Sequence, residues 1–511
     1  MRSMKTMISD IRRILAAVFA AAAISCLGSC SWLDIQPADT MGEDDLFETG
    51  AGYRNALNGI YLKLASTSLY GRELTYGMTE ALAHTHEWSM AYKNNLDYQD
   101  VASYNYTTNG VKNIISGIWS TAYNTIANCN NLIDKISAEA GDKFAEGETE
   151  RDLIHGEALA ARAFCHFLIM SYFAPAPALY KADEEGKYPV YLPYYSTFSK
   201  EIGEYMDIPA FTERIVEDLK AARELVCKYE LQDNLHTYRL MPKYRFTGKT
   251  YSSSYPQPSD IFFAFRGYRL NYYAITAILA RVYDYAGDYQ NAVAEARTVI
   301  DATSPGGKLF SFTSNEDAHK DYKLSSDLIF GLSKTTLIDD YGRFRSSGTT
   351  LQLNSMYAGI ISSSTSDYRW NTLVQKNTEG NSVCARYTVP SMSGDMTSAT
   401  QDILPVIRLS EMYYILAEKA ADDALYARAA DYIEEVQVGR SAPENQLSGK
   451  ISDDYSFKKE FLADVRLEFI EEGRIFLYCK KLDVAPNSWD SADSFRESWW
   501  YFPIPENETI F

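Results

Sequence analysis

Residues 270–300 read LNYYAITAILARVYDYAGDYQNAVAEARTVI, and this stretch decides the fold. Apolar and small residues recur at helical spacing through 270–285 and again through 287–299, with Gly287 at the join. Alanines in the second run allow two helices to approach closely. The order glycine, aromatic, spaced alanines is typical of a tetratricopeptide hairpin. The stretch therefore predicts two antiparallel helices packed against each other.

Residues 409–438 repeat the pattern, with four alanines at helical spacing. The same spacing of apolar residues predicts further amphipathic helices at 51–65, 112–136, 148–173 and 210–225. The 34-residue period typical of tetratricopeptide arrays does not recur in tandem, which excludes a regular solenoid and disfavours a generic tetratricopeptide adaptor as the alternative function. We predict a mostly α fold, in which a tetratricopeptide-like helical-hairpin scaffold carries the binding surface on long irregular loops, above all in 303–405.

Composition narrows the function. The chain has 511 residues and a net charge of −19, with 49 basic and 68 acidic side chains. No basic stripe is present, so binding to nucleic acid would gain no free energy from the release of phosphate counterions. Nucleic acid is therefore excluded as a partner. The sequence also contains 39 tyrosines, whose flat rings and hydroxyl groups suit half-wet binding surfaces.

The first 29 residues predict an export signal. Basic residues precede an apolar run of 14 residues, 14–27, which is too short to span a membrane. The sequence Leu27-Gly28-Ser29-Cys30 then resembles the bacterial lipoprotein box, which implies cleavage before Cys30 and lipid attachment to it. Four basic residues and one acidic residue leave with the signal, so the exported chain carries −22. The alternatives are a soluble export signal with an incidental Cys30, and lipidation at Cys26.

Five cysteines remain after Cys30. Their odd number and the absence of C-x-x-C spacing favour buried free thiols over a disulfide framework.

Catalytic signatures are absent from the sequence. The stretch Gly248-Lys249-Thr250 lacks the earlier glycine of a phosphate loop, because Lys243 stands there. His84 and His86 alternate as two metal ligands on a strand would, yet no third ligand is in view, so ordinary hydrogen-bonded roles are favoured. The adjacent carboxylates of 471–472 suit glycoside hydrolysis only if the fold brings two carboxyl groups together. We therefore predict no enzyme activity, no metal and no cofactor.

A series of short motifs in a fixed order carries a family resemblance. In the first half these are Leu33–Pro37, Asn55–Tyr61, Leu69–Gly71, Trp119 with Tyr123 and Ile126, and Gly156–Phe164; in the second half they are Pro405–Glu418, Arg466–Arg474 and Phe502–Pro505. Together with the lipoprotein box, they resemble the SusD/RagB family of outer-membrane nutrient-binding lipoproteins. The chain departs from the family pattern at Leu477 and Tyr478, where relatives usually carry an acidic and a basic residue.

The resemblance implies a domain plan and a function. The plan is a signal peptide at 1–29, a SusD-like N-terminal region at 30–230, a loop-rich boundary at 231–265 and a C-terminal region at 266–511. The implied protein lies in the outer membrane, anchored through Cys30 and facing the cell exterior, where it binds oligosaccharide or polysaccharide. It hands this ligand to a SusC-like TonB-dependent transporter. A peptide-binding member of the family and a surface α/α-toroid glycoside hydrolase remain as alternatives.

Ligand-binding candidates come from two aromatic-rich stretches without an evident helical period, 76–106 and 338–372. Sugar rings stack on aromatic planes, and their hydroxyl groups need amide, hydroxyl or guanidinium partners. The candidates are Trp88, Tyr92, Asn94, Asn95, Tyr98, Tyr341, Arg343, Tyr368 and Trp370. Trp88 and Trp370 are the expected stacking platforms, the alternative being loop aromatics that only pack on the scaffold. Trp119 is assigned to the core, and the tryptophans at 499–500 to packing or partner contacts.

Seven charged residues lie on otherwise apolar helices. We expect them to form buried ion pairs that set helix register rather than to bind ligand. They are Arg162, Arg408, Glu411, Glu418, Arg466, Glu472 and Arg474. The acidic run 183–185 is assigned to solvent, with a Ca²⁺ site as the alternative.

Overall fold

Side-chain caps begin both helices of the hairpin at 270–300. In the computed structural model, Asn271 Oδ1 accepts from the amides of Tyr273 and Ala274, each at 2.9 Å, and opens α12 (Tyr272–Tyr285). Asp288 caps α13 (Tyr289–Ile300) in the same way. Gly287 turns the chain between them with φ of +78°, a conformation that favours glycine. The predicted hairpin is confirmed.

The structure describes residues 43–176, 180–184, 186–232, 237–248, 258, 260–346, 350–361, 366–392, 394–486 and 495–506. Cys30 and the predicted signal lie outside these residues. The chain forms two units, 1–52 and 53–511. In the first, α2 (Glu43–Leu46) precedes the start of α3 (Gly50–Leu64), which continues into the second unit.

The other predicted helices are present within a few residues of their expected bounds. They are α3, α7 (Asn109–Ser137), α8 (Gly147–Phe173), α9 (Ile208–Glu230), α19 (Leu409–Asp422) and α20 (Tyr426–Gly439). The helix α8 ends two residues before Pro175, because the residue before a proline disfavours the helical conformation. The prediction of a mostly α fold is confirmed.

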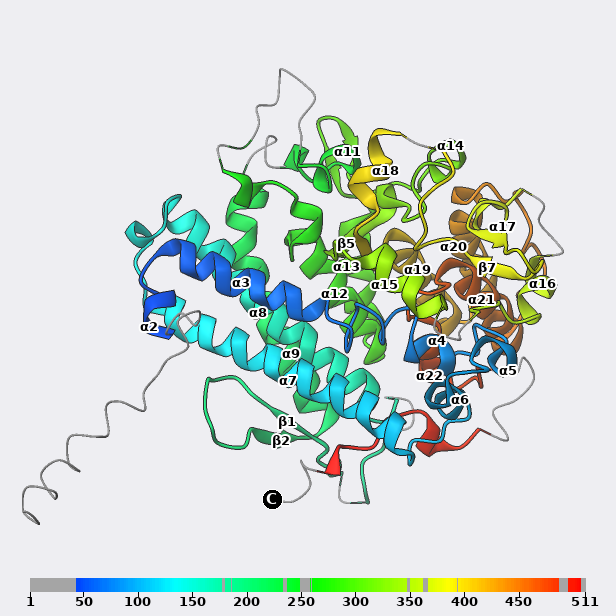
Figure 1. Ribbon diagram of the computed structural model, residues 1–511, viewed down its shortest axis with the longest axis horizontal. Helices are drawn as coiled ribbons and strands as arrows, with labels where there is room; N and C mark the ends of the chain where they lie inside the picture. Colours follow the sequence, from blue (N-terminus) through cyan, green and yellow to red (C-terminus); the bar gives the residue numbers. More distant parts are fainter. Residues whose placement is uncertain are drawn as a thin grey trace, which may run out of the picture. The chain divides into compact units, whose positions relative to one another are not determined.

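Helices of the second unit pack in succession. α8 contacts α7 and α9, α9 contacts α12, α13 contacts α19, and α20 contacts α21 (Asp454–Glu468), which contacts α22 (Ile475–Leu482). Figure 1 shows α7, α8 and α9 lying alongside one another. The segments 231–271 and 301–408 interrupt this succession in the sequence. The hairpins are therefore neighbours in space although they are not tandem repeats in the chain.

Helix α8 packs against both α7 and α9. Among the described residues it alone is long and apolar enough to cross a membrane, and 94% of its most apolar window is buried inside the protein. This is the burial expected of a core helix.

Strands are short and come in antiparallel pairs. β5 (Leu328–Ser333) pairs with β8 (Ile403–Arg408), and both are almost wholly buried. The other pairs are β1 (Leu192–Tyr194) with β2 (Glu204–Met206), β3 (Thr303–Ser304) with β4 (Gly307–Lys308), and β6 (Val374–Lys376) with β7 (Ser382–Cys384).

Short helices occupy the stretches for which the sequence predicted loops. The first stretch contains α4 (Met78–Leu82), α5 (Trp88–Ala91) and α6 (Leu96–Ala102); the second contains α15 (Leu337–Ser346), α16 (Met356–Ile361) and α17 (Tyr368–Asn371). Elsewhere lie α11 (Pro242–Arg245), α14 (Asn315–Ala318), α18 (Asp395–Thr400) and the 3-10 turns η1 (Gly141–Lys143), η3 (Ile261–Phe263), η4 (Arg266–Tyr268), η5 (Ser325–Asp327) and η6 (Glu497–Trp499). Most are too short to show a period in the sequence.

The five cysteines that follow Cys30 are free, as predicted. Cys129, Cys165, Cys384 and Cys479 are buried, and Cys227 is half-buried.

Candidate functional site

Four tyrosines predicted to bind ligand are buried. Tyr92, Tyr98, Tyr341 and Tyr368 are each at most 4% exposed. Their hydroxyl groups are already engaged: Tyr98 donates to Glu73 Oε2 at 2.8 Å, and Tyr341 donates to Glu471 Oε2 at 2.8 Å. These four predictions are therefore wrong, because a side chain closed off from solvent cannot meet a ligand that arrives from solution.

The hydroxyl groups of the other two tyrosines are engaged in the same way. Tyr368 donates to the carbonyl oxygen of Thr313 at 2.6 Å, and the Tyr92 hydroxyl lies 3.0 Å from His86 Nδ1. A signal in the sequence marks one of the four as core. Leu337, Tyr341 and Phe344 have the spacing of one helix face, and all three are buried on α15.

The other candidates lie at or near the surface. Trp88 is 38% exposed on α5, Asn94 and Arg343 are exposed, and Asn95 is half-buried. Trp370 is half-buried and packs against a cluster that includes Leu353, Tyr357, Cys384, Leu467 and Ile470. Trp88 therefore presents more of its ring to solvent than Trp370 does.

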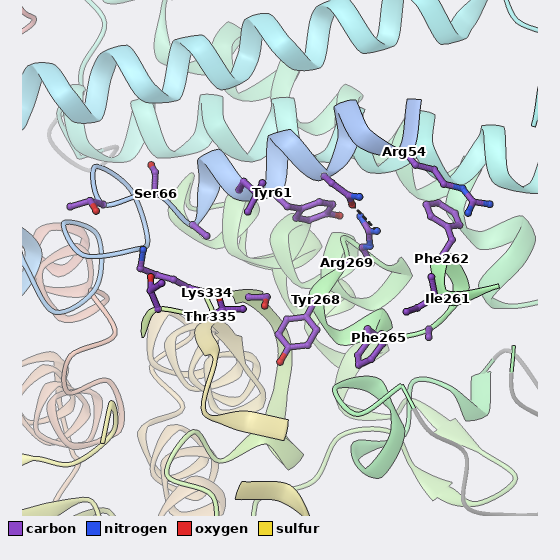
Figure 2. Close-up of a pocket in the computed structure, with 17 residues that line it drawn as sticks. Arg54, Tyr61, Ser66, Ile261, Phe262, Phe265, Tyr268, Arg269, Lys334 and Thr335 are labelled. Atoms are coloured by element: carbon purple, nitrogen blue, oxygen red, sulfur yellow. Dashed lines mark hydrogen bonds between the residues drawn. The ribbon is translucent and has the colours of Figure 1, made fainter. Parts of the chain in front are cut away.

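A cavity among the described residues lies elsewhere, beside α3. Its volume is about 740 Å³, within the range of small-ligand sites. One wall is α3 with the loop that follows it, the second is the segment 261–269, and the third is Ser333–Thr336 beyond β5. In Figure 2, Arg54 and Tyr61 on α3 lie opposite Phe262, Tyr268 and Arg269. We call this the main cavity.

Guanidinium groups and rings stack along one side of the main cavity. Arg54 lies 4.7 Å from the Phe262 ring centroid, and Arg269 lies 5.0 Å from that of Tyr61. Arg54 also pairs with Asp260 at 2.7 Å, and Arg269 Nη2 donates to Asn58 Oδ1 at 3.0 Å. Because each guanidinium is held from two sides, this wall is formed before a ligand binds.

Phe265 lies on the main cavity in a strained conformation. Its φ is +54°, in the left-handed region that costs a non-glycine residue about 1–2 kcal/mol. Its ring is nevertheless 37% exposed. A Cβ added to Gly248 would lie 2.6 Å from this ring, so Gly248 leaves the room that the ring occupies. A partly exposed apolar ring that lies on a cavity and on a strained backbone makes Phe265 a candidate ligand contact.

A smaller cavity of about 240 Å³ adjoins the main one, since Thr67 lines both. Its lining includes Arg72, Asp340 and the predicted candidate Arg343. Burial raises the pKa of Asp340, but hydrogen bonds from Thr336, Arg343 and Lys334 outweigh it and lower that pKa to about 2. Asp340 is therefore ionised at neutral pH, and it forms ion pairs with Lys334 and Arg343 beside the cavities.

Six of the seven charged residues predicted to pair on apolar helices contact an oppositely charged side chain, and Arg466 bonds to a backbone carbonyl oxygen. Arg162 Nη2 contacts Asp218 Oδ1 at 2.7 Å, and Arg408 Nε contacts Glu472 Oε2 at 2.7 Å. Glu411 accepts from Arg281 at 2.7 Å and from Arg474 at 3.3 Å, and Glu418 accepts from Lys481 at 2.7 Å. Arg466 is fully buried and donates from Nη2 to the carbonyl oxygen of Pro486 at 2.9 Å. Removing one partner of such a pair costs about 3–5 kcal/mol.

The sequence missed a second buried network, around Glu468. This carboxylate accepts from Arg440 Nε at 3.0 Å and from Arg369 Nη1 at 3.2 Å, and Arg369 also contacts Asp464 at 2.8 Å. Burial raises the pKa of Glu468, but the two guanidinium groups hold it well below its ordinary value. These residues come from α17, from the position that directly follows α20, and from α21, so no local pattern brings them together.

The residues considered for metal binding or hydrolysis have structural roles. His84 Nε2 lies 2.7 Å from the carbonyl oxygen of Ala102, and His86 Nε2 lies 3.2 Å from Glu471. Glu471 and Glu472 are buried with different partners, and so do not flank a cleft. Within the described ranges no group of three His, Cys, Asp or Glu side chains suits a metal ion. Asp183 and Glu184 of the acidic run are exposed, and the run's third residue lies outside those ranges.

Among the described residues, the tryptophans other than Trp88 and Trp370 pack within the protein. Trp119 is buried against Phe173, in agreement with its assignment to the core. Trp500 is buried, and Trp499 stacks on Tyr104 with ring centroids 5.1 Å apart.

Comparison with known proteins finds a match to a protein family. Residues 31–247 match the SusD-like family model described as starch-binding and associating with the outer membrane. A curated relative, SusD-like protein P2 of Formosa agariphila, is 23% identical over 355 residues. This alignment covers 67% of the chain but only 56% of the relative.

Solved structures share the fold over nearly the whole chain. A SusD superfamily protein from Bacteroides vulgatus has a TM-score of 0.64 at 19% identity, covering 91% of this chain and 97% of that one. One from Bacteroides thetaiotaomicron has a TM-score of 0.63 at 19% identity, covering 90% and 97%. A laminarin-binding SusD-like protein has a TM-score of 0.58 at 15% identity, covering 91% and 98%. Residues 31–247 are therefore similar to the SusD-like family, and the chain shares the fold of SusD superfamily structures over nearly its whole length.

Proposed function

We propose that this protein is a cell-surface lipoprotein that binds oligosaccharides and passes them to a SusC-like TonB-dependent transporter in the outer membrane. The family description names starch binding and outer-membrane association, and one relative of the same fold binds laminarin. The proposed role is binding without turnover, since no catalytic arrangement was found among the described residues.

The observation that carries the proposal is Phe265 on the main cavity. Its backbone is strained, Gly248 leaves room for its ring, and the residue is partly exposed on a cavity of about 740 Å³. Sugar C–H faces stack on such rings, and sugar hydroxyl groups bond to neighbouring polar groups. Hydroxyl groups that line the cavity belong to Ser66, Thr67, Thr335 and Thr336.

The adjoining smaller cavity extends this surface toward Arg343. We propose that a longer sugar chain continues from the main cavity past Thr67 into the smaller cavity, because Thr67 lines both cavities. The exposed part of the predicted surface, with Trp88, Asn94, Asn95 and Trp370, remains a proposed second stacking area. A shallow site of this kind has a Kd on the order of μM to mM, about −8 to −4 kcal/mol.

The anchor and orientation are part of the proposal. Lipid on Cys30 would hold the protein to the outer membrane, with its body facing the cell exterior. The match to the family model begins at residue 31, directly after Cys30, which supports this position for the start of the exported chain.

The test is Phe265→Ala, assayed by calorimetry against a glycan panel, with peptides as competitors and product analysis of the same mixtures. We expect affinity for the bound glycan to fall tenfold or more, because the stacking plane is lost, while Tm stays unchanged. Val438→Ala is the matched control, since Val438 is an apolar side chain on α20 that is 42% exposed and does not line the cavity. Trp88→Ala is measured in parallel.

Three results would overturn parts of the proposal. Cleavage of the sugar would show an enzyme. Binding of peptides alone would favour the peptide-binding alternative. Unchanged glycan binding by Phe265→Ala, with loss in Trp88→Ala, would move the site to α5.

A further inference from the structure

A third cavity lies between α7 and the segment that runs on from β1. Its volume is about 340 Å³, and it shares no lining residue with the main cavity. One wall is the middle of α7, from Trp119 to Asn130, and the other is the segment 193–199. We call it the hairpin cavity, because β1 and β2 form the hairpin to which that segment belongs.

The chemistry of the hairpin cavity is neutral. None of its lining residues carries a charge, although 23% of the whole chain is charged. Aromatic rings come from Trp119, Tyr123, Tyr195 and Phe198, and neutral hydrogen-bonding side chains come from Ser120, Asn124, Asn130, Thr197 and Ser199. Rings beside amides and hydroxyl groups match the C–H faces and hydroxyl groups of an uncharged sugar. The main cavity differs, because three cationic side chains line it: Arg54, Arg269 and Lys334.

A buried ion pair holds the outer wall in place. Arg162 pairs with Asp218, and its Nη1 donates to the carbonyl oxygen of Ser196 at 2.8 Å and to Asn130 Oδ1 at 2.9 Å. Asn130 Nδ2 in turn donates to the carbonyl oxygens of Tyr195 and Thr197, each at 3.1 Å. These hydrogen bonds tie the wall to α7 and α8. The wall is therefore ordered before a ligand binds, and binding does not lose the entropy of ordering it.

The rings are set at an angle to each other. Tyr123 donates to the carbonyl oxygen of Pro193 at 3.0 Å, and its ring meets Tyr195 at 72° with centroids 5.4 Å apart. Phe198 is 52% exposed at the opening. A ligand that covers an apolar ring exposed at the opening of a cavity gains about 25 cal/mol of binding free energy for each Å² of ring removed from water.

We propose that the hairpin cavity is a second glycan-binding site, which takes uncharged sugar units. The choice of a glycan as the ligand rests on the proposed function. The hairpin cavity and its residues are separate from the main cavity. Phe198 and Tyr195 supply the stacking planes, and Asn124 and Ser120 on α7 meet the sugar hydroxyl groups.

The test compares the full exported chain with the double variant Tyr195→Ala/Phe198→Ala. Calorimetry and saturation-transfer NMR are run with neutral gluco- and manno-hexaoses and with an acidic oligogalacturonate at millimolar concentration. We expect the double variant to lose tenfold or more in affinity for one neutral hexaose, with its Tm unchanged. Tyr205→Ala is the matched control, because Tyr205 is 43% exposed on the same hairpin and does not line the cavity.

The outcomes separate the two sites. Identical affinity and stoichiometry in wild type and double variant for every neutral hexaose would overturn the hairpin site, as would the absence of any neutral-hexaose binding by wild type. An equal loss in Tyr205→Ala would also overturn it, by showing a general effect of the hairpin. Loss in the double variant together with full binding by Phe265→Ala would support the hairpin site and reject the main cavity instead.

Discussion

Glu80 is a buried carboxylate on α4. Its Oε1 accepts from the backbone amide of Gly473 at 2.9 Å, which links the N-terminal part of the fold to the C-terminal part. Burial raises the pKa of Glu80 from 4.5 to about 8, and the nearby charge of Glu471 adds to the rise. In the folded protein the group therefore keeps its proton at neutral pH.

This residue makes stability depend on pH. Between pH 4.5 and about 8, the folded state holds a proton that the unfolded state has lost. The free energy of unfolding should therefore fall by about 1.4 kcal/mol for each pH unit of increase in this range. Glu80→Gln, which imitates the protonated acid, should remove this slope and be more stable than wild type at pH 8. Urea unfolding from pH 5 to 8 measures it.

The control is Glu213→Gln, an exposed acid on α9. It should keep the wild-type slope. A Glu80→Gln protein that loses stability with pH as steeply as wild type would show that another group sets the dependence.

At the scale of elements, the short helices and the turns between them decide which side chains reach the surface. The turn between α21 and α22 is an example. Gly473 has φ of +70°, and a Cβ added there would lie 1.9 Å from the carbonyl oxygen of Leu74. The turn and the loop before α4 therefore approach each other as closely as backbones without a side chain allow.

Gly473→Ala should destabilise the protein by about 2–5 kcal/mol, through left-handed strain and the backbone clash. Gly342→Ala is the matched control, because nothing lies within 4 Å of a Cβ added at this position in α15. The control should be neutral or more stable by about 0.5–1 kcal/mol. Denaturant unfolding of both variants tests this, and a Gly473→Ala variant as stable as wild type would contradict the contact.

At the scale of the whole molecule, parts of the second unit that are distant in sequence interlock. His86 meets Glu471, Glu80 meets Gly473, and the amide of Phe502 donates to the carbonyl oxygen of Tyr172 at 2.8 Å. The loop-rich segments therefore rest on the helical scaffold through contacts between the two halves of the chain. Their side chains are sorted into core and surface by these contacts.

Cleavage before Cys30 would leave a chain with a net charge of −22, and this charge gives the proposed anchor a clear test. Such a chain is repelled by anionic surfaces, so electrostatic attraction does not tether it. Several acyl chains on Cys30 hold a protein stably, since each buried methylene contributes about 0.8 kcal/mol. Cys30→Ala should release the protein from the membrane fraction, and a high-salt wash should leave wild type bound. Cys26→Ala is the matched control and should stay in the membrane. Membrane retention of Cys30→Ala would contradict the lipid site.

The helical scaffold was predictable because its information is local. The alanines and Gly287 in 270–300 specify a hairpin by spacing alone, and the long helices α7, α8 and α9 repeat their apolar stripe over many turns. Capping by Asn271 and Asp288 belongs to the same scale. Burial of charged residues on these stripes was also predictable, since a charge on an apolar face needs a partner.

The binding surface was not predictable from local patterns. Tyr341 and Phe265 are both aromatic residues in segments without long helices, yet Tyr341 is buried against Glu471 and Phe265 opens onto a cavity. What separates them is contact with elements far along the chain, and sequence spacing carries no record of such contacts. The sequence by itself determined the helical frame and carried the family resemblance, because periodicity and ordered motifs are local. Only the tertiary structure decided which rings meet solvent, because exposure depends on what packs over a residue.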